Sequence, residues 1–275
     1  MHVTRRPTNN LGNMIVKESG KTYKPSRQSQ KNDDHIVYGL RPVIEAVDSG
    51  RQIDKVLLRT GMQGDNTGEL RQRLREANIP IQYVPVEKLN SLTKNNHQGV
   101  VAIISPIVYH DFATIAQQSL DEGRTPFFVL LDHVTDVRNV GAIARTAECA
   151  GMDALVVPAH GSAQIGADAI KSSAGALLRI PVCREDNLKS VVNLAKQMSF
   201  QVVAATEKAA GSYLSVDFTK PTLLMMGAED RGISNDLLRL ADQRAAIPVR
   251  GEIQSLNVSV AAAVFIFEAL RQREA

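Results

Sequence analysis

The sequence predicts an α/β protein with two folded units, and three observations lead to this class. Of its 275 residues, 44% are apolar and 22% are charged, values typical of a globular protein. The chain is long enough for two domains of ordinary size. Short apolar runs that suit buried strands alternate with longer segments of helical periodicity. Such alternation favours a parallel sheet covered by helices on both faces.

The first 34 residues differ in composition from the rest of the chain. Residues 1–31 carry seven lysines and arginines and one acid, a net charge of +6, whereas the whole chain carries +3. The segment is polar and shows no sustained periodicity, so it cannot bury enough apolar surface to offset chain entropy. We therefore predict a disordered basic arm over 1–34, which either attracts phosphate backbones or only improves solubility.

The first predicted unit is a small α/β domain over residues 35–108. We expect helices over 40–47, 68–77 and 86–92, and strands over 53–58, 81–84 and 99–107. Pro106 ends the last of these strands, because proline lacks the amide that a sheet uses. A linker over 109–125, with a helix over 111–122 capped by Asp111, leads into the second unit.

The second predicted unit, residues 126–275, alternates regularly between strands and helices. We expect strands over 127–131, 154–157, 201–205, 221–226 and 245–248, a short strand at Val182, and helices over 140–150, 168–178, 188–198, 234–240 and 256–273. Because these strands are apolar without polar alternation, they predict a parallel sheet with helices on both faces. Ligands of such a sheet bind beyond the carboxyl ends of its strands.

The last predicted helix is apolar on nearly all sides. Between residues 258 and 270 only Ser259 and Glu268 are polar. A helix on the outside of one sheet needs a single apolar stripe. The second apolar face therefore favours a homodimer over a helix that is deeply enclosed within one chain.

Several functional classes lack their sequence signatures. Cys149 and Cys183 are too few for a disulfide framework or a four-ligand zinc site, and we expect both to be reduced core thiols. The six histidines do not cluster at metal-ligand spacing. No segment resembles a membrane span or a secretion signal, so we expect a cytoplasmic protein without a metal, with an organelle import sequence as the alternative. The glycine-rich nucleotide loops and the serine elbow of hydrolases are also missing.

Three polar, glycine-containing segments follow predicted strands. They are 132–141 (DHVTDVRNVG), 227–232 (GAEDRG) and 247–257 (IPVRGEIQSLN). Loops at the carboxyl edge of one parallel sheet can build a composite site from backbone groups and polar side chains. The residue pattern alone leaves open whether that site belongs to an enzyme or to a binding protein.

At these segments the sequence resembles the SpoU (TrmH-like) branch of the SPOUT RNA 2′-O-methyltransferases. The matching stretches are LDHVTDVRNVGAIARTAECAG at 131–151, LLMMGAEDRGIS at 223–234 and IPVRGEIQSLNVSVAAAVFIFEAL at 247–270. Upstream, HIVYGLRPVIEAV at 35–47 and HQGVVA at 97–102 resemble the ribosomal-protein-like substrate-binding domain of RlmB-type members, which modify a guanosine ribose of 23S rRNA.

The resemblance implies a fold, a cofactor and partners. It implies a SPOUT domain with a deep trefoil knot, which general topology rules would exclude. It implies S-adenosylmethionine as the cofactor, RNA as the substrate (23S rRNA first, tRNA as the alternative) and a homodimer formed through the C-terminal helix and the knot. A non-catalytic ribosome-assembly factor of the same fold is the alternative from another class. The third candidate is a dinucleotide-dependent oxidoreductase, but the sequence lacks the glycine motif of that class.

The resemblance also assigns residues. Those carried over as catalytic are Asn139, Arg145, Glu229, Ser255 and Asn257. Those carried over as cofactor-binding are Ala204, Ala205, Thr206, Met226, Gly227, Ala228, Gly232, Ile247, Pro248, Ser255, Leu256 and Asn257. A methyl sulfonium is already electrophilic, so the protein chiefly aligns the ribose 2′-hydroxyl and helps to remove its proton. Because a guanidinium is a poor proton acceptor, we interpret Arg145 as a phosphate clamp rather than as a base.

The five catalytic candidates also have structural explanations. Asn139 could cap the helix that follows it, and Arg145 could be an exposed helical arginine. Glu229 could pair with the arginine two residues further on. Ser255 and Asn257 could cap the last helix, and capping could coexist with catalysis there.

Two positions depart from the family pattern. Val137 stands where proline is common, and Asp230 stands where glycine is frequent. Neither position supplies a reacting group, so the departures bear on fine specificity rather than on the class of enzyme.

The run 94–98 (KNNHQ) is either an RNA-contacting loop of the first unit or a solvated turn.

Deletion of residues 1–31 tests the role of the basic arm. Because each neutralised phosphate releases counterions, loss of seven cations should lower RNA affinity and flatten its dependence on salt, while cofactor affinity stays unchanged. Dissociation constants for RNA at several salt concentrations, for the full and shortened proteins, check this. An unchanged salt slope would make the arm a solubilising tail only.

Overall fold

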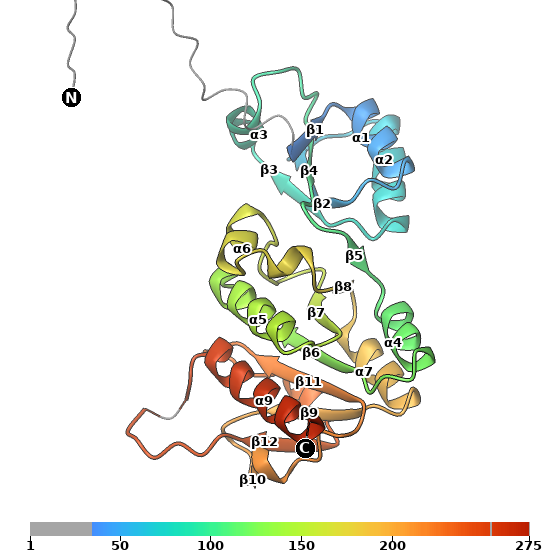
Figure 1. Cartoon of the computed structure of the whole chain (residues 1–275). Helices are drawn as coiled ribbons and strands as arrows, with labels where there is room; N and C mark the ends of the chain where they lie inside the picture. Colours follow the sequence, from blue (N-terminus) through green and yellow to red (C-terminus); the bar gives the residue numbers. More distant parts are fainter. Residues whose placement is uncertain (1–34, 254, 275) are drawn as a thin grey trace, which may run out of the picture.

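Two sheets organise the residues that the structure describes, 35–253 and 255–274. In this computed structural model, a four-stranded sheet forms the core of a smaller unit and an eight-stranded sheet that of a larger one (Figure 1). The basic arm predicted over 1–34 lies outside the described residues. Within them, no helix is both long and apolar enough to cross a membrane.

The smaller unit has helices on both faces of its sheet. In sheet order its strands are β1 (Ile36–Tyr38), β4 (Val100–Ile104), β2 (Ile53–Arg59) and β3 (Ile81–Val84), and its helices are α1 (Leu40–Asp48), α2 (Asp65–Glu76) and α3 (Val86–Leu92). The helices α1 and α2 pack on one face through Val43, Leu70 and Leu74, and α3 covers the other through Leu89. The strand β1, which the sequence did not predict, pairs antiparallel with β4.

The run 94–98 is a structural turn of this smaller unit. His97 is buried, with its Nε2 2.9 Å from Asn90 Oδ1, and its Nδ1 accepts a hydrogen bond from the Gly99 amide at 3.0 Å. Gln98 Oε1 accepts a hydrogen bond from the Leu40 amide. These side chains satisfy groups of their own unit, which favours the turn interpretation over an RNA-contacting loop.

The larger unit contains a parallel sheet, as the sequence predicts. In sheet order its strands are β10 (Gly211–Ser212), β12 (Gln243–Ala246), β9 (Gln201–Ala205), β11 (Thr222–Gly227), β6 (Phe127–Asp132), β7 (Ala154–Pro158), β8 (Val182–Glu185) and β5 (Tyr109–His110). Every pairing in this sheet is parallel. The two long neighbours β6 and β11 are almost fully buried, because their continuous apolar side chains face helices on both sides.

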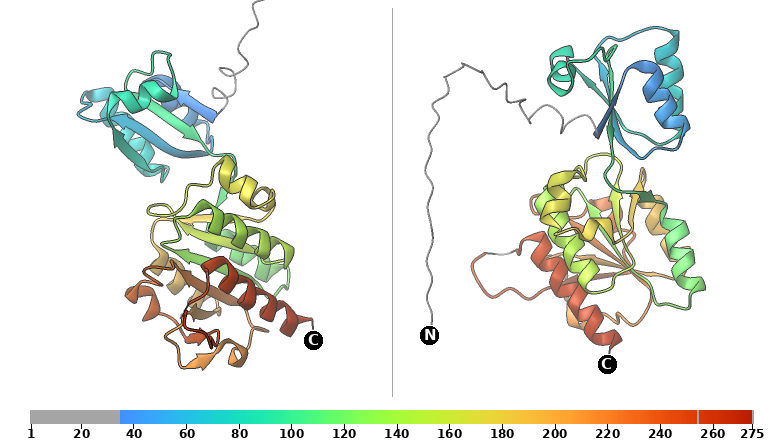
Figure 2. Two further views of the ribbon diagram at one scale, coloured as in Figure 1. Left: turned by 90° about the vertical axis from the view of Figure 1, so that its left-hand side faces the viewer. Right: turned by 45° about the horizontal axis from the view of Figure 1, so that its top comes forward.

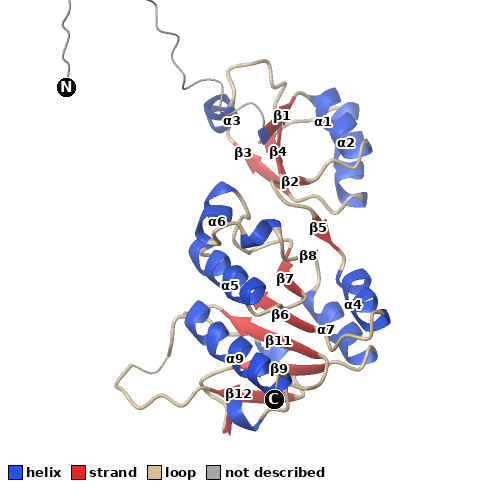
Figure 3. Ribbon diagram, viewed as in Figure 1, coloured by secondary structure: helices blue, strands red, loops and turns tan. Residues whose placement is uncertain are grey.

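Helices cover both faces of the large sheet (Figure 3). One face is covered by α5 (Val137–Cys149), α6 (Ala167–Ser172), the 3-10 helix η2 (Ala176–Leu178) and α9 (Val258–Arg273). The other face is covered by α4 (Phe112–Asp121), α7 (Leu188–Gln197) and α8 (Asn235–Leu238). A further 3-10 helix, η3 (Tyr213–Ser215), follows β10. This arrangement confirms the predicted layers.

Local chemistry explains where the helices depart from the predicted bounds. α5 begins three residues earlier than predicted, since the Asp136 side chain accepts a hydrogen bond from the Arg138 amide at 2.8 Å and caps it. The predicted helix over 168–178 is divided in two, because Ala174 and Gly175 adopt left-handed backbone angles.

Cys149 is exposed at the end of α5, so the prediction that it is a core thiol was wrong.

The chain crosses between the two units through a single connection (Figure 2), and a polar contact also joins them. From β8, the Arg184 guanidinium donates hydrogen bonds of 3.2 to 3.3 Å to the carbonyl oxygens of Ile53 and Asp54 in β2. The same guanidinium lies 4.0 Å from the ring centroid of Tyr109, and burial raises the pKa of that tyrosine to about 12. The segment 109–125, which we predicted to be a linker, contains β5 and α4. Both of these elements pack in the larger unit.

Substitution of Gly141 tests the packing of α5 on α6. A β-carbon at Gly141 would lie 2.0 Å from Ser172 Oγ and 2.9 Å from the Ser173 amide nitrogen. Gly141→Ala should therefore lower the free energy of unfolding by about 1–3 kcal/mol, because backbone must move to relieve the clash. Gly68→Ala is the matched control: its methyl meets nothing within 4 Å, and it should stabilise α2 by about 1 kcal/mol. Urea denaturation of both variants measures the difference, and an undiminished stability of Gly141→Ala would contradict this packing.

Candidate functional site

Two adjoining cavities lie at the carboxyl ends of the central strands, where the parallel sheet predicts a ligand site. The first, here called the strand-end cavity, has a volume of about 370 Å³ and is formed by segments that follow β9, β11 and β12, together with the start of α9. The second, here called the α5 cavity, has a volume of about 500 Å³ and lies beside the first turn of α5. Both are lined by Ala228, Glu229, Asp230 and Val258.

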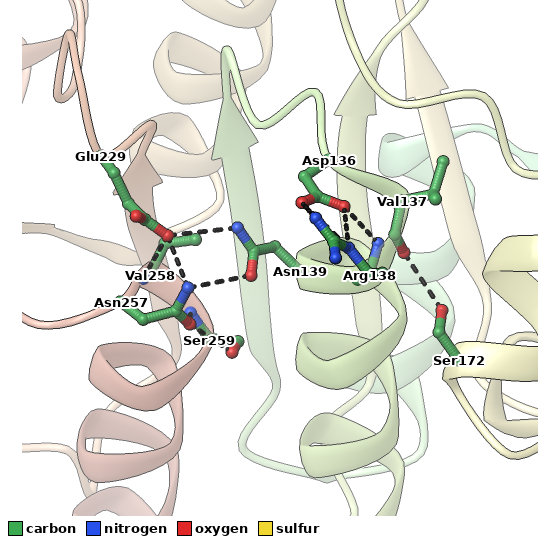
Figure 4. A network of polar contacts seen from close by, with 9 residues as sticks. All are labelled: Asp136, Val137, Arg138, Asn139, Ser172, Glu229, Asn257, Val258 and Ser259. Atoms are coloured by element: carbon green, nitrogen blue, oxygen red, sulfur yellow. Dashed lines mark hydrogen bonds and ion pairs between the residues drawn. The ribbon is translucent and has the colours of Figure 1, made fainter.

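The carboxylate of Glu229 is the centre of a polar cluster between the two cavities (Figure 4). Its Oε1 accepts hydrogen bonds from Asn257 Nδ2 at 2.5 Å and from Asn139 Nδ2 at 3.2 Å. Asn257 Nδ2 also lies 3.0 Å from Asn139 Oδ1 and donates to it. The Val258 amide donates to the same Glu229 oxygen at 3.4 Å. One residue from each of the three polar sequence segments thus meets at this point.

Helix starts position the two asparagines of the cluster. Asp136 caps α5, so Asn139 lies within the first turn and its amide points toward Glu229. The alternative explanation of Asn139 as a helix cap is therefore not observed. Asn257 does cap α9, accepting a hydrogen bond from the Ser259 amide at 2.9 Å, while its Nδ2 binds the carboxylate. At Asn257, capping and membership of the cluster coexist.

A tight backbone turn after β11 positions Glu229. A β-carbon at Gly227 would lie 2.1 Å from the Gly232 carbonyl carbon, so only glycine fits where the turn folds back on its strand. The turn is tied to β6, because the Ala228 amide donates to the Asp132 carbonyl at 3.1 Å. Arg231 pairs with its neighbour Asp230 at 3.4 Å rather than with Glu229, so the pairing suggested as a structural explanation for Glu229 is not observed.

Most of the residues carried over as cofactor-binding line the strand-end cavity. Those that do are Ala205, Thr206, Met226, Gly227, Ala228, Gly232, Ile247, Ser255 and Leu256. Asn257 lines the α5 cavity instead. Ala204 is fully buried in the core and Pro248 is exposed, and neither lines a cavity.

Two of the five catalytic candidates lie apart from the carboxylate cluster. Arg145 is exposed on α5 and lines neither cavity, and its guanidinium makes no hydrogen bond or ion pair within the part of the chain that the structure describes. Ser255 is exposed and lines the strand-end cavity, but its hydroxyl makes no side-chain hydrogen bond with the described residues. One chain therefore brings together Asn139, Glu229 and Asn257, and leaves Arg145 outside.

The apolar floor of the strand-end cavity was not predicted. Leu238 of α8 and Ala261 and Phe265 of α9 line it. In sequence these residues look like ordinary core positions of two helices, and only the packing of α9 over the strand ends brings them to the cavity. Among the described residues, no group of three or more histidines, cysteines and acids is placed to hold a metal ion.

Two segments of the chain match models of known families. Residues 126–267 match the SpoU rRNA Methylase family, and residues 36–110 match the RNA 2′-O ribose methyltransferase substrate binding domain. A TrmH-family relative from Staphylococcus haemolyticus is 32% identical over 88% of this chain and 97% of its own length. A relative from Staphylococcus aureus is 31% identical over the same shares.

Solved structures of similar proteins agree with this match. The SpoU methyltransferase AviRb from Streptomyces viridochromogenes, in complex with AdoMet, aligns with a TM-score of 0.56 and 28% identity over 87% of this chain and 90% of that one. An AdoMet-bound rRNA methyltransferase from Sinorhizobium meliloti gives a TM-score of 0.56 and 27% identity over 86% and 87%. The family model covers more than half of the chain, and the three polar segments that form the cavities lie within it. The chain belongs to the SpoU rRNA methylase family.

Proposed function

We propose that this SpoU-family RNA 2′-O-ribose methyltransferase transfers the methyl group of S-adenosylmethionine to a guanosine of 23S rRNA. The observation that carries the proposal is the Glu229 cluster, which separates two adjoining cavities. A group-transfer enzyme needs a donor site and an acceptor site that meet at the reacting atoms. The strand-end cavity is the proposed donor site, and the α5 cavity is the proposed acceptor site.

The residues of the strand-end cavity fit S-adenosylmethionine. Leu238 and Phe265 supply an apolar floor for a base, and the ends of β9, β11 and β12 supply a polar rim. The carboxylate of Glu229 lies at the boundary with the α5 cavity, where it would attract a cationic centre. When bound, S-adenosylmethionine supplies an electrophilic methyl group on a sulfonium. Two related structures, those of the Streptomyces and Sinorhizobium proteins, contain this cofactor.

The chain's own residues would align the acceptor. Asn139 and Asn257, held by Glu229, face the α5 cavity and can fix a ribose there through their amide groups. Alignment of the 2′-hydroxyl with an electrophilic methyl group lowers the barrier, because the entropy of bringing the two groups together is spent on binding. Arg145 is the proposed clamp on the adjacent phosphate.

We propose that a homodimer brings Arg145 to the site. α9 exposes Val260 and Phe267, seven residues apart on one helical face, with 50% and 49% of their surfaces accessible. A second copy that covers this face would also approach α5, which packs beside α9. The site would then combine Glu229 of one subunit with Arg145 of the other.

The smaller unit is the proposed RNA-binding part of the enzyme. Its match to a substrate-binding domain supports the proposed division into 35–108 for RNA binding, 109–125 as the connection and 126–275 as the methyltransferase domain. The deep trefoil knot, formed where the 247–257 segment precedes α9, is part of the same proposal. The alternative substrate is tRNA, which the name of the Staphylococcus haemolyticus relative gives beside rRNA.

Methylation of defined RNAs tests the proposed function. Purified protein with labelled S-adenosylmethionine should methylate 23S rRNA, and reverse-transcription stops at one guanosine should vanish in a strain without the gene. Label in tRNA alone would select the alternative substrate. Cofactor binding without methylation of any rRNA or tRNA would contradict the enzyme and favour an assembly factor.

Neutralisation of Glu229 should weaken cofactor binding. Because Glu229→Gln removes the negative charge facing the proposed sulfonium, we expect S-adenosylmethionine affinity to fall about tenfold. Glu252→Gln, an exposed loop carboxylate that lines neither cavity, is the charge-matched control and should leave affinity unchanged. Isothermal calorimetry measures both. An equal effect of the two substitutions would show that the Glu229 position does not matter.

Mixing of two inactive variants tests whether the site is shared between subunits. Arg145→Ala and Glu229→Gln should each abolish or strongly reduce transfer while the fold stays intact, as circular dichroism would show. If the site combines both subunits, unfolding and refolding them together should restore about a quarter of wild-type activity, because half of the dimers then contain one intact site. No recovery in verified mixed dimers would place both residues in one subunit's site.

A further inference from the structure

His133 occupies a strained position between β6 and α5. Its φ is +59°, in the left-handed region that glycine adopts freely and that asparagine, aspartate and histidine adopt more often than other residues. The flanking carbonyls are both fixed: that of Asp132 accepts from the Ala228 amide at 3.1 Å, and that of Val134 accepts from the Ala163 amide at 3.1 Å. Strain that the surroundings hold in place in this way is common at functional sites.

The contacts of the ring give its two nitrogens different environments. Nδ1 lies 3.0 Å from Asp132 Oδ1 and is buried without a well-formed hydrogen bond. The other oxygen of that carboxylate accepts from the Ser234 amide at 2.7 Å, so the carboxylate cannot turn away from the ring. Because the carboxylate and the burial block access to Nδ1, Nε2 is the ring nitrogen that can bind a partner from outside.

The ring borders the α5 cavity. That cavity is lined by His133 together with Asn139, Glu229 and Asn257. The imidazole side chain is 44% exposed although Nδ1 is buried, so the accessible part of the ring is the edge that carries Nε2. A nucleotide that enters the cavity would therefore be within reach of both His133 and the Glu229 cluster.

We propose that His133 is a substrate-contacting residue, whose Nε2 forms a hydrogen bond with the RNA nucleotide held in the α5 cavity. The inference rests on the proposed function, because it takes RNA as the occupant of that cavity. A purely structural role does not explain the residue. Glycine would adopt the same backbone at lower cost, and the half-exposed ring adds no side chain to the buried core of the sheet.

The strained backbone makes a clean experiment possible. His133→Gly removes the ring and suits the left-handed angle, so its thermal midpoint should equal or exceed that of the wild type. We expect its KM for RNA to rise about three- to tenfold, as the loss of one hydrogen bond implies, with a smaller change in kcat. Affinity for S-adenosylmethionine should stay unchanged, since His133 does not line the strand-end cavity.

Ser199→Gly is the matched control. Ser199 also has a left-handed backbone, with φ of +66°, but it lies in the turn before β9 and lines neither cavity. It should show the same thermal effect with no change in KM for RNA. His133→Asn is a second variant that tolerates the left-handed angle while replacing the ring, in case glycine loosens the loop.

RNA affinity is also measured directly, by fluorescence anisotropy with S-adenosylhomocysteine bound, so that the result does not depend on turnover. Weaker RNA binding by both His133 variants, but not by Ser199→Gly, supports the contact. Unchanged KM and RNA affinity in both variants overturn it, as does a loss confined to kcat. Failure of the wild type to methylate RNA would contradict the proposed function, and the anisotropy comparison would still decide the role of His133.

Discussion

The carboxylate of Glu229 is the interaction on which the rest of the site depends. One of its oxygens accepts hydrogen bonds from two asparagine amides and from the first amide of α9. It thereby fastens the start of α5, the turn after β11 and the start of α9 to one another. Hydrogen bonds to a charged acceptor are stronger than those between neutral groups, and the amides at the start of α9 favour a negative charge. Without this carboxylate, the two asparagine amides and the first amide of α9 would lose the hydrogen-bond acceptor that they share at the boundary between the two cavities.

The backbone around the cluster explains why it forms at that point. β6 and β11 are paired in parallel along their full lengths, so their carboxyl ends deliver 132–141 and 227–232 to the same edge. Gly227 allows the second segment to fold back within contact distance of its own strand. α9 then packs beside α5 and brings Asn257 to the carboxylate. The strand-end cavity and the α5 cavity are consequences of that convergence.

The sequence predicts the layers and the site segments well, since both depend on local patterns. Continuous apolar strands indicate a buried parallel sheet, and polar, glycine-containing segments after them indicate a ligand edge. Details that depend on which of several nearby residues makes a contact or becomes buried were harder to predict. Asp136 rather than Asn139 caps α5, and Cys149 is exposed although Ala147 and Ala150 close by are buried. Arg145 stays apart from the cluster because its side chain leaves α5 outside both cavities, a direction that linear order does not reveal.

The chemical position of the transferred methyl group tests the account most directly. Labelled S-adenosylmethionine and RNA are incubated with the enzyme, the RNA is digested to nucleosides, and the products are separated by mass spectrometry. Two cavities that meet at the Glu229 cluster, with a ribose fixed by Asn139 and Asn257, predict that the label appears in a 2′-O-methyl nucleoside. Label on a base nitrogen or carbon, with none on the ribose, would contradict the account.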